Sequence, residues 1–178
     1  MAIIDEENVL TSIVLDVAKR MVTAAVTAPK AKGIRNMYTA IITGSDIIPI
    51  AVKMEQMALE FDVPSFHRDA QNIKQCDAMV LLGTAIQSIN LKKCGMCGFA
   101  NCAEKNKHST VPCVFNTGDL GIALGSAVSI AMDNRIDNRI MYTVGQAVKE
   151  LDIFPENVSI IYAIPLKASS KNIFFDRG

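Results

Sequence analysis

The sequence has few aromatic residues and no excess of charge of either sign. It contains no Trp, 7 Phe and 3 Tyr, and its 18 basic side chains balance 18 acidic ones over 178 residues. A nucleic-acid-binding protein needs a surplus of Lys and Arg to replace the counterions of the phosphates, and a single-strand binder also needs aromatic stacking platforms. The composition therefore argues against a nucleic-acid partner.

The sequence also lacks the apolar segments that direct export or membrane insertion. Its first residues include Asp5, Glu6 and Glu7, whereas a signal peptide begins with basic residues followed by an apolar run. No stretch of about 18 uncharged apolar residues occurs, so we expect no membrane span. A cytoplasmic location follows as the expectation, and in that compartment thiols stay reduced.

Apolar residues are abundant, at 50% of the chain, and they follow helical and strand patterns. Short apolar runs predict strands buried on both faces, and longer segments with apolar residues every three or four positions predict helices. The predicted strands are 37–43, 77–83 and 158–164. The predicted helices are 5–27, 47–60, a short one from Asp69, 118–132 with Asn116 or Thr117 as its cap, and 138–151. This pattern predicts one domain over residues 1–178 of the α+β class, an α/β sandwich in which helices cover a sheet.

The chain has five cysteines, and four of them form one group: Cys94, Cys97, Cys102 and Cys113. Their spacing, C-x2-C-x4-C-x10-C, supplies the four thiolates that complete the shell of a tetrahedral zinc ion or of a 4Fe–4S cluster. Gly95 and Gly98 let the backbone turn sharply and direct N–H groups at sulfur. A single CxxC pair with two further cysteines favours the iron–sulfur cluster. A structural zinc site with four cysteine ligands, in a non-enzymatic protein, stays open as the alternative.

Positive side chains accompany these cysteines within a predicted metal-binding loop over residues 88–116. They are Lys92, Lys93, Lys105 and Lys107. A cluster held by four thiolates carries negative charge, which nearby ammonium groups would offset. His108 lies in the same loop, where we expect an exposed side chain and not a metal ligand.

The segment 94–104, CGMCGFANCAE, resembles the small four-cysteine 4Fe–4S module of corrinoid iron–sulfur proteins and of the B subunits of electron-transport complexes. Cys113 follows at a shorter spacing than is usual in that module. Nearly the whole chain resembles the uncharacterised prokaryotic family of ferredoxin domain-containing proteins. The segments that carry this likeness are 28–33, 66–72, the cysteine loop, 112–116, 119–130, 137–142 and 164–177. The resemblance implies a 4Fe–4S cluster and electron transfer, with an unknown electron donor or acceptor, and it names no reaction.

A second resemblance, to nitroreductase-like flavoproteins, rests on the order of four segments. They are a first helix ending in APKAKG, a strand from Met37, a small-residue helix beginning DLGIA, and a late strand running into IPL. In that family the Ala-Pro loop contacts flavin and the small-residue helix lies in the dimer interface. The resemblance therefore implies a nitroreductase-like fold, a homodimer, FMN as a second candidate cofactor and oxidoreductase activity as a candidate function.

This chain departs from the nitroreductase pattern where the flavin phosphate binds. The arginine-rich start is absent, and Lys30 and Lys32 replace the usual Ser and Asn. The side chains we expect to hold an anion instead are Lys30, Lys32, Arg35 and, from the C-terminal tail, Lys171 and Arg177. Ordinary solvated lysines are the alternative interpretation at each of these positions.

Two further features have a structural and a functional interpretation. In the run His67-Arg68-Asp69, we expect Asp69 to cap a helix and order a loop, whereas a general acid or base role of His67 is the alternative. Cys76 stands alone before a predicted strand and is expected to pack as a small apolar side chain. The sequence identifies no catalytic residue.

Overall fold

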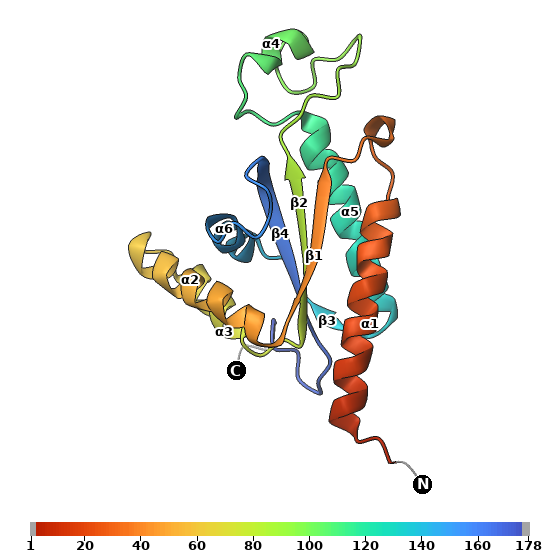
Figure 1. The fold of residues 1–178 in the computed structure, drawn as a ribbon, viewed down its shortest axis with the longest axis vertical. Helices are drawn as coiled ribbons and strands as arrows, with labels where there is room; N and C mark the ends of the chain where they lie inside the picture. The colour runs from red at the N-terminus through yellow and green to blue at the C-terminus, as the bar shows by residue number, and fades with distance from the viewer. Residues whose placement is uncertain (1–2, 176–178) are drawn as a thin grey trace.

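The computed structural model describes residues 3–175, and the predicted anion-binding residue Arg177 lies outside them. A four-stranded sheet lies between two layers of helices (Figure 1). The strands are β1 (Met37–Thr43), β2 (Ala78–Ala85), β3 (Asp137–Asn138) and β4 (Val158–Lys167). The helices are α1 (Glu6–Thr27), α2 (Ile47–Glu60), α3 (Pro64–Ile73), α4 (Cys102–Asn106), α5 (Val114–Asp133) and α6 (Tyr142–Glu150), with 3-10 turns η1 (Ala31–Gly33) and η2 (Gly44–Asp46).

The sheet is antiparallel throughout and has the strand order β1-β2-β4-β3. Met37 of β1 lies opposite Thr84 of β2, and Ala78 of β2 lies opposite Leu166 of β4. Every residue of β2 is buried. An antiparallel strand is usually solvated on one face, so complete burial shows that β2 is covered by helices on both sides.

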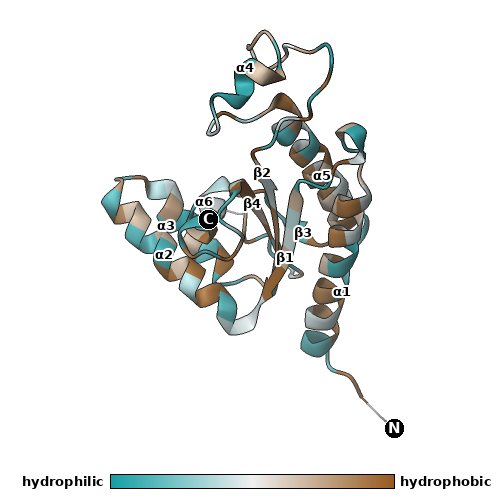
Figure 2. Cartoon of the chain, turned by 45° about the horizontal axis from the view of Figure 1, so that its top comes forward, coloured by the Kyte–Doolittle hydropathy of each residue, from teal (hydrophilic) through white to brown (hydrophobic). Residues whose placement is uncertain are grey.

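Two hydrophobic cores fill the space between the sheet and its helices. Helices α1 and α5 lie on one side of the sheet, and α2, α3 and α6 lie on the other (Figure 1). Along β2, Val80 and Leu82 belong to the first core, whereas Met79 and Leu81 belong to the second. Successive strand residues point to opposite faces, so one apolar strand serves both cores. The helices carry mixed hydrophobic and hydrophilic residues, as expected when one face packs on a sheet (Figure 2).

The predicted α+β sandwich is confirmed, and several predicted boundaries match. The strand predicted over 37–43 is β1, and the helix predicted over 47–60 is α2. Two helices begin earlier than predicted. Helix α3 begins at Pro64, because proline at the first helical position supplies a helical φ and needs no N–H partner. Helix α5 begins at Val114 and not at residue 118.

Other differences arise from pairing between distant segments. The helix predicted over 138–151 is shorter, because Asp137 and Asn138 form β3 and pair with Lys167 and Leu166 of β4. Helix α4 lies in the segment predicted to be loop. The pattern of residues within a short stretch of sequence does not show which distant segment that stretch pairs with.

Helix α5 is the one helix among residues 3–175 that is long and apolar enough, by length and composition, to cross a membrane. In the structure its inner face packs with α1 and the sheet through Leu120, Ala123 and Ala127. Its outer face, which includes Gly121 and Ile122, is exposed. We interpret α5 as a core helix with one uncovered face.

Candidate functional site

The cysteine loop connects the end of β2 at Ala85 to the start of α5 at Val114. It extends beyond the end of the sheet, at the top of the molecule in Figure 1. Its short helix α4 begins after Asn101, whose side chain accepts a hydrogen bond from the Glu104 N–H at 2.9 Å. Asparagine is a favoured N-cap residue because its side-chain oxygen satisfies an otherwise unpaired helix N–H. The loop is therefore locally structured in the segment that carries Cys102.

All five cysteines are free thiols. Cys94, Cys97 and Cys102 are partly exposed, and Cys113 is buried. Gly98 follows Cys97 and has a φ of 88°, a backbone conformation that residues other than glycine rarely adopt. Within residues 3–175, no three His, Cys, Asp or Glu side chains are close enough together to hold a metal ion. The four thiols thus share one loop without forming a closed metal shell in this conformation.

Cys113 caps the N-terminus of α5. The Cys113 carbonyl accepts a hydrogen bond from the backbone N–H of Asn116 at 2.9 Å, and the Asn116 Oδ1 accepts one from the Cys113 N–H at 3.1 Å. Of the four loop cysteines, Cys113 is the one held at the N-terminus of a long helix.

Asn116 connects the two ends of the cysteine loop. Its Oδ1 also accepts a hydrogen bond from the Gln87 N–H at 3.1 Å, and its Nδ2 donates to the Gln87 carbonyl at 2.9 Å. Asn116 is only 2% exposed, whereas Gln87 is exposed, so these two bonds are partly shielded from water. The prediction of Asn116 or Thr117 as the cap of α5 is wrong, because Cys113 is the cap and Asn116 is its partner.

The predicted anion-binding residues lie at two ends of the sheet. Lys30, Lys32 and Arg35 precede β1, whose first residue lies opposite Thr84 near the start of the cysteine loop. Lys171 lies four residues after Lys167, the last residue of β4. That end of β4 lies beside the beginning of β2. The fold therefore brings three of these side chains to the end that carries the cysteines, and Lys171 to the other end.

Lys30 and Lys32 both donate to backbone carbonyls. The Lys30 Nζ donates to the carbonyls of residues 25, 26 and 28 at 3.0, 2.7 and 2.7 Å, so it satisfies the C-terminus of α1. Burial lowers the pKa of Lys30, and the nearby Asp119 carboxylate opposes that shift. The Lys32 Nζ donates to the carbonyls of Ile89 and Asn90 at 3.3 and 3.4 Å. Lys32 therefore ties η1 to the cysteine loop.

A largely apolar groove of about 330 Å³ lies between η1 and α5. Its lining residues are Pro29, Lys30, Ala31, Met96, Val114, Phe115, Gly118, Asp119 and Ile122. The Asp119 carboxylate accepts a hydrogen bond from the Ala31 N–H at 3.1 Å and joins the two walls. The sequence pointed to residues 28–33 and to the small-residue helix separately, and the fold places them in one groove beside Met96 of the cysteine loop.

Asp69 does not cap a helix, because it lies inside α3. Its buried carboxylate accepts hydrogen bonds from the Arg68 Nε at 2.8 Å and from the Thr143 hydroxyl of α6 at 2.7 Å. Asp69 thus joins α3 to α6, and the capping prediction is wrong. The exposed His67 contacts Glu55 of α2, with 2.6 Å between Nδ1 and Oε2.

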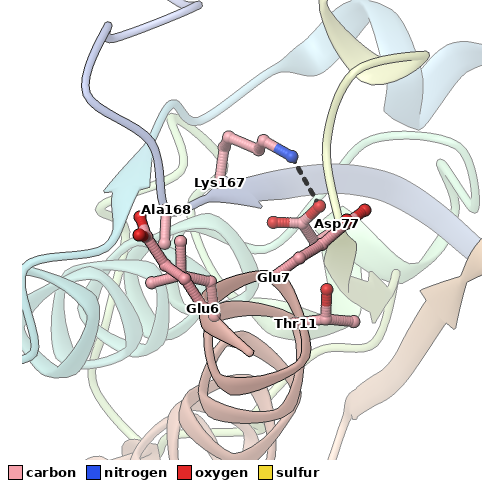
Figure 3. Close-up of a pocket in the computed structure, with 7 residues that line it drawn as sticks. Glu6, Glu7, Thr11, Asp77, Lys167 and Ala168 are labelled. Atoms are coloured by element: carbon pink, nitrogen blue, oxygen red, sulfur yellow. Dashed lines mark hydrogen bonds and ion pairs between the residues drawn. The ribbon is translucent and has the colours of Figure 1, made fainter. Parts of the chain in front are cut away.

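A second hollow, of about 280 Å³, lies at the other end of the sheet (Figure 3). Glu6 and Glu7 of α1 border it, and the Lys167 ammonium lies 2.7 Å from an Asp77 carboxylate oxygen. Because Asp77 neutralises this lysine, the hollow presents acidic groups to solvent. None of the candidate cofactor or metal residues lines it.

Solved structures of similar fold are flavoproteins of the nitroreductase type. A nitroreductase from Desulfitobacterium hafniense with bound FMN has a TM-score of 0.61 at 13% identity, over 88% of this chain and 78% of that one. A nitroreductase from Lactococcus lactis in complex with nicotinic acid also has a TM-score of 0.61 at 13% identity, over 95% and 81% of the two chains. At such low identity the likeness shows the fold alone, and that fold is nitroreductase-like.

Sequence comparisons identify the family. The family described as uncharacterized protein containing a ferredoxin domain (DUF2148) matches residues 109–177, a range that includes Cys113 and begins after the other three loop cysteines. An uncharacterized protein from Archaeoglobus fulgidus is 37% identical over 165 residues, which cover 89% of this chain and 88% of the relative. The chain therefore belongs to the family of uncharacterized proteins that contain a ferredoxin domain, and it has a nitroreductase-like fold.

Proposed function

We propose that this protein is a redox protein that binds one 4Fe–4S cluster through Cys94, Cys97, Cys102 and Cys113. The observation that carries the proposal is that four free thiols lie in one loop whose two ends Asn116 holds together. The ferredoxin description of the family and the oxidoreductase fold both indicate redox chemistry. A reducing compartment, the cytoplasm, is the location we propose.

The residues of the loop have distinct parts in this proposal. Cys113, buried at the N-terminus of α5, would be a fixed ligand, whereas the partly exposed Cys94, Cys97 and Cys102 would have to come closer together to complete the shell. Their partial exposure leaves an edge through which a partner exchanges electrons. Four thiolates are the usual ligands of a 4Fe–4S cluster, which supplies one-electron transfer when it is bound.

A cysteine-to-serine series tests this ligand assignment. Anaerobically purified wild-type protein and the matched control Cys76→Ser should both be brown, whereas Cys113→Ser should lose most of its iron and visible absorption. A colourless wild-type protein with about one zinc per chain would instead establish the structural zinc site with four cysteine ligands. Equal iron content in Cys113→Ser and wild type would remove Cys113 from the ligand set.

We also propose that FMN binds in the groove between η1 and α5. The apolar walls near Pro29 and Ile122 suit the flavin ring, and the exposed Arg35 is a cation available at the same end of the sheet. A structure of the same fold is described with bound FMN. Flavin, when bound, supplies hydride chemistry and would make the protein an oxidoreductase. Heating the holoprotein should release a yellow fluorescent chromophore, and a colourless supernatant would refute this proposal.

A homodimer through the outer face of α5 is the third part of the proposal. Gly118, Gly121 and Gly125 lie on this face with no neighbouring atom near the position of a Cβ. Glycine inside a helix costs about 1 kcal/mol relative to alanine, and close approach of a second backbone would account for that cost. Sedimentation should give a dimer for wild type and a monomer for Gly121→Arg. A monomeric wild type would contradict the dimer.

A further inference from the structure

Lys105 is a buried cation without a counter-charge in the described chain. It lies on α4 and is 3% exposed. No group among residues 3–175 forms a hydrogen bond or ion pair with its ammonium, which retains contact with solvent-accessible space. Lys107, two residues later, donates to a Glu104 carboxylate oxygen at 2.7 Å. The ammonium therefore reaches solvent without a counter-charge among the described residues, and it is available to an anion from outside the chain.

The Lys105 side chain lines a hollow of about 240 Å³ between the end of β2 and α4. The other lining residues are Ile86, Gln87, Ser88, Asn90, Asn106 and Ser109. Apart from Ile86, their side chains are hydroxyls and amides, which can donate hydrogen bonds. No carboxylate lines the hollow, so nothing within it competes for the ammonium. An ammonium with neutral donors around it selects an oxyanion as ligand.

Two further contacts organise this hollow. The buried Ser88 hydroxyl donates to the Asn106 Oδ1 at 2.6 Å, which fixes the amide and leaves the two Nδ2 hydrogens free to donate. On the neighbouring backbone, Lys32 donates to the carbonyls of Ile89 and Asn90. This second ammonium adds positive potential next to the hollow, which favours anion entry.

We propose that this hollow binds a small oxyanion, a phosphate or carboxylate group, with Lys105 as its counter-charge. Its volume of about 240 Å³ is below the range of about 300–1,000 Å³ typical of drug-sized ligands, so it fits a small charged group. Lys105 is three residues from Cys102, and an anion held here lies on the loop that carries the candidate redox centre. The proposal goes beyond the redox function and holds whichever metal the four thiols bind.

Calorimetric titration of the purified holoprotein with inorganic phosphate, at constant ionic strength, tests the proposal. Wild type and the matched control Lys107→Gln should bind phosphate, and Lys105→Gln should bind at least about tenfold more weakly, because a charge-assisted hydrogen bond is lost. A parallel titration with malonate distinguishes the sources. Phosphate binding alone identifies a phosphate site, and malonate binding that depends on Lys105 identifies a carboxylate site.

Asn106→Asp keeps the test decisive if Lys105→Gln fails to fold. The new carboxylate would pair with Lys105 inside the hollow, so we expect a higher melting temperature and loss of phosphate and malonate binding. The proposal is overturned if wild type binds neither anion. It is also overturned if the Lys105 and Asn106 variants bind as tightly as wild type, or if Lys105→Gln changes only the reduction potential of the metal centre.

Discussion

At the scale of single residues, Cys113 and Asn116 show how a ligand position is tied to the fold. Asparagine and threonine are common helix caps, and for that reason the sequence predicts Asn116 or Thr117 as the cap of α5. The structure gives this role to Cys113, because the buried Asn116 amide is engaged with Gln87 and Cys113. Gln87 is distant in sequence, so no local pattern contains this contact.

Replacing Asn116 with alanine should loosen the whole cysteine loop. The change leaves the buried N–H of Cys113, and the partly buried N–H and carbonyl of Gln87, without their Asn116 partner. We expect the free energy of unfolding to fall by about 1–3 kcal/mol and the bound metal to dissociate more readily. Urea unfolding and metal release to a chelator measure both effects.

Thr117→Ala is the matched control for Asn116→Ala. Thr117 is exposed, and its side-chain hydroxyl donates only to the Val114 carbonyl among the described residues. It should change stability by less than about 0.5 kcal/mol. Equal effects of the two substitutions would show that Asn116 acts only as a helix residue.

Cys76 differs in chemistry from the four loop cysteines. Its thiol donates to the Ile73 carbonyl at 3.0 Å, and burial raises its pKa to about 12 from the ordinary value of 9.0. The folded state therefore keeps a proton that the unfolded state releases as pH rises above about 9. Stability should fall over the window from about pH 9 to about pH 12, by at most about 1.4 kcal/mol per pH unit.

Urea unfolding of wild type and Cys76→Ala at about pH 8 and about pH 10 isolates this contribution of Cys76. The stability difference between the two proteins should shrink at the higher pH, because only wild type has the buried thiol. A difference that is independent of pH would contradict a neutral, partly buried Cys76.

At the scale of elements, α6 packs on β4 through a glycine. A Cβ at Gly145 would lie 1.8 Å from the carbonyl oxygen of Ile161, so any other residue must move the helix off the strand. Gly145→Ala should lower the free energy of unfolding by about 2–3 kcal/mol despite alanine's higher helix propensity. Gln146→Ala, exposed on the same helix, should change it by less than about 0.5 kcal/mol. Thermal unfolding of both variants tests this, and a stabilising Gly145→Ala would be contrary to the packing.

The bounds of some helices and strands can be predicted from sequence patterns alone. Strand β1 and helix α2 match their predicted ranges, because each has an uninterrupted apolar pattern ended by residues that favour turns. The sequence predicts a helix that includes Asn138, whereas the structure has this residue in the short strand β3. Strand β3 forms only through its pairing with β4, which no local pattern reveals. The role of Asp69 was missed for the same reason, because its partner Thr143 lies on another helix.

At the scale of the whole molecule, the sheet separates two ends with different chemistry. One end carries the cysteine loop, the apolar groove at Pro29 and the polar hollow at Lys105. The other end carries the acidic hollow near Asp77 (Figure 3). The sequence spacing predicted that the four cysteines act together. It did not predict the groove, because the segments at Pro29 and Ile122 meet only through the packing of α1 on α5.

Metal analysis of anaerobically purified protein tests whether the cysteine loop holds an iron–sulfur cluster. We expect about four irons and about four acid-labile sulfides per chain, because four thiolates complete the shell of a single 4Fe–4S cluster. A protein with about one zinc per chain and no labile sulfide would contradict this expectation.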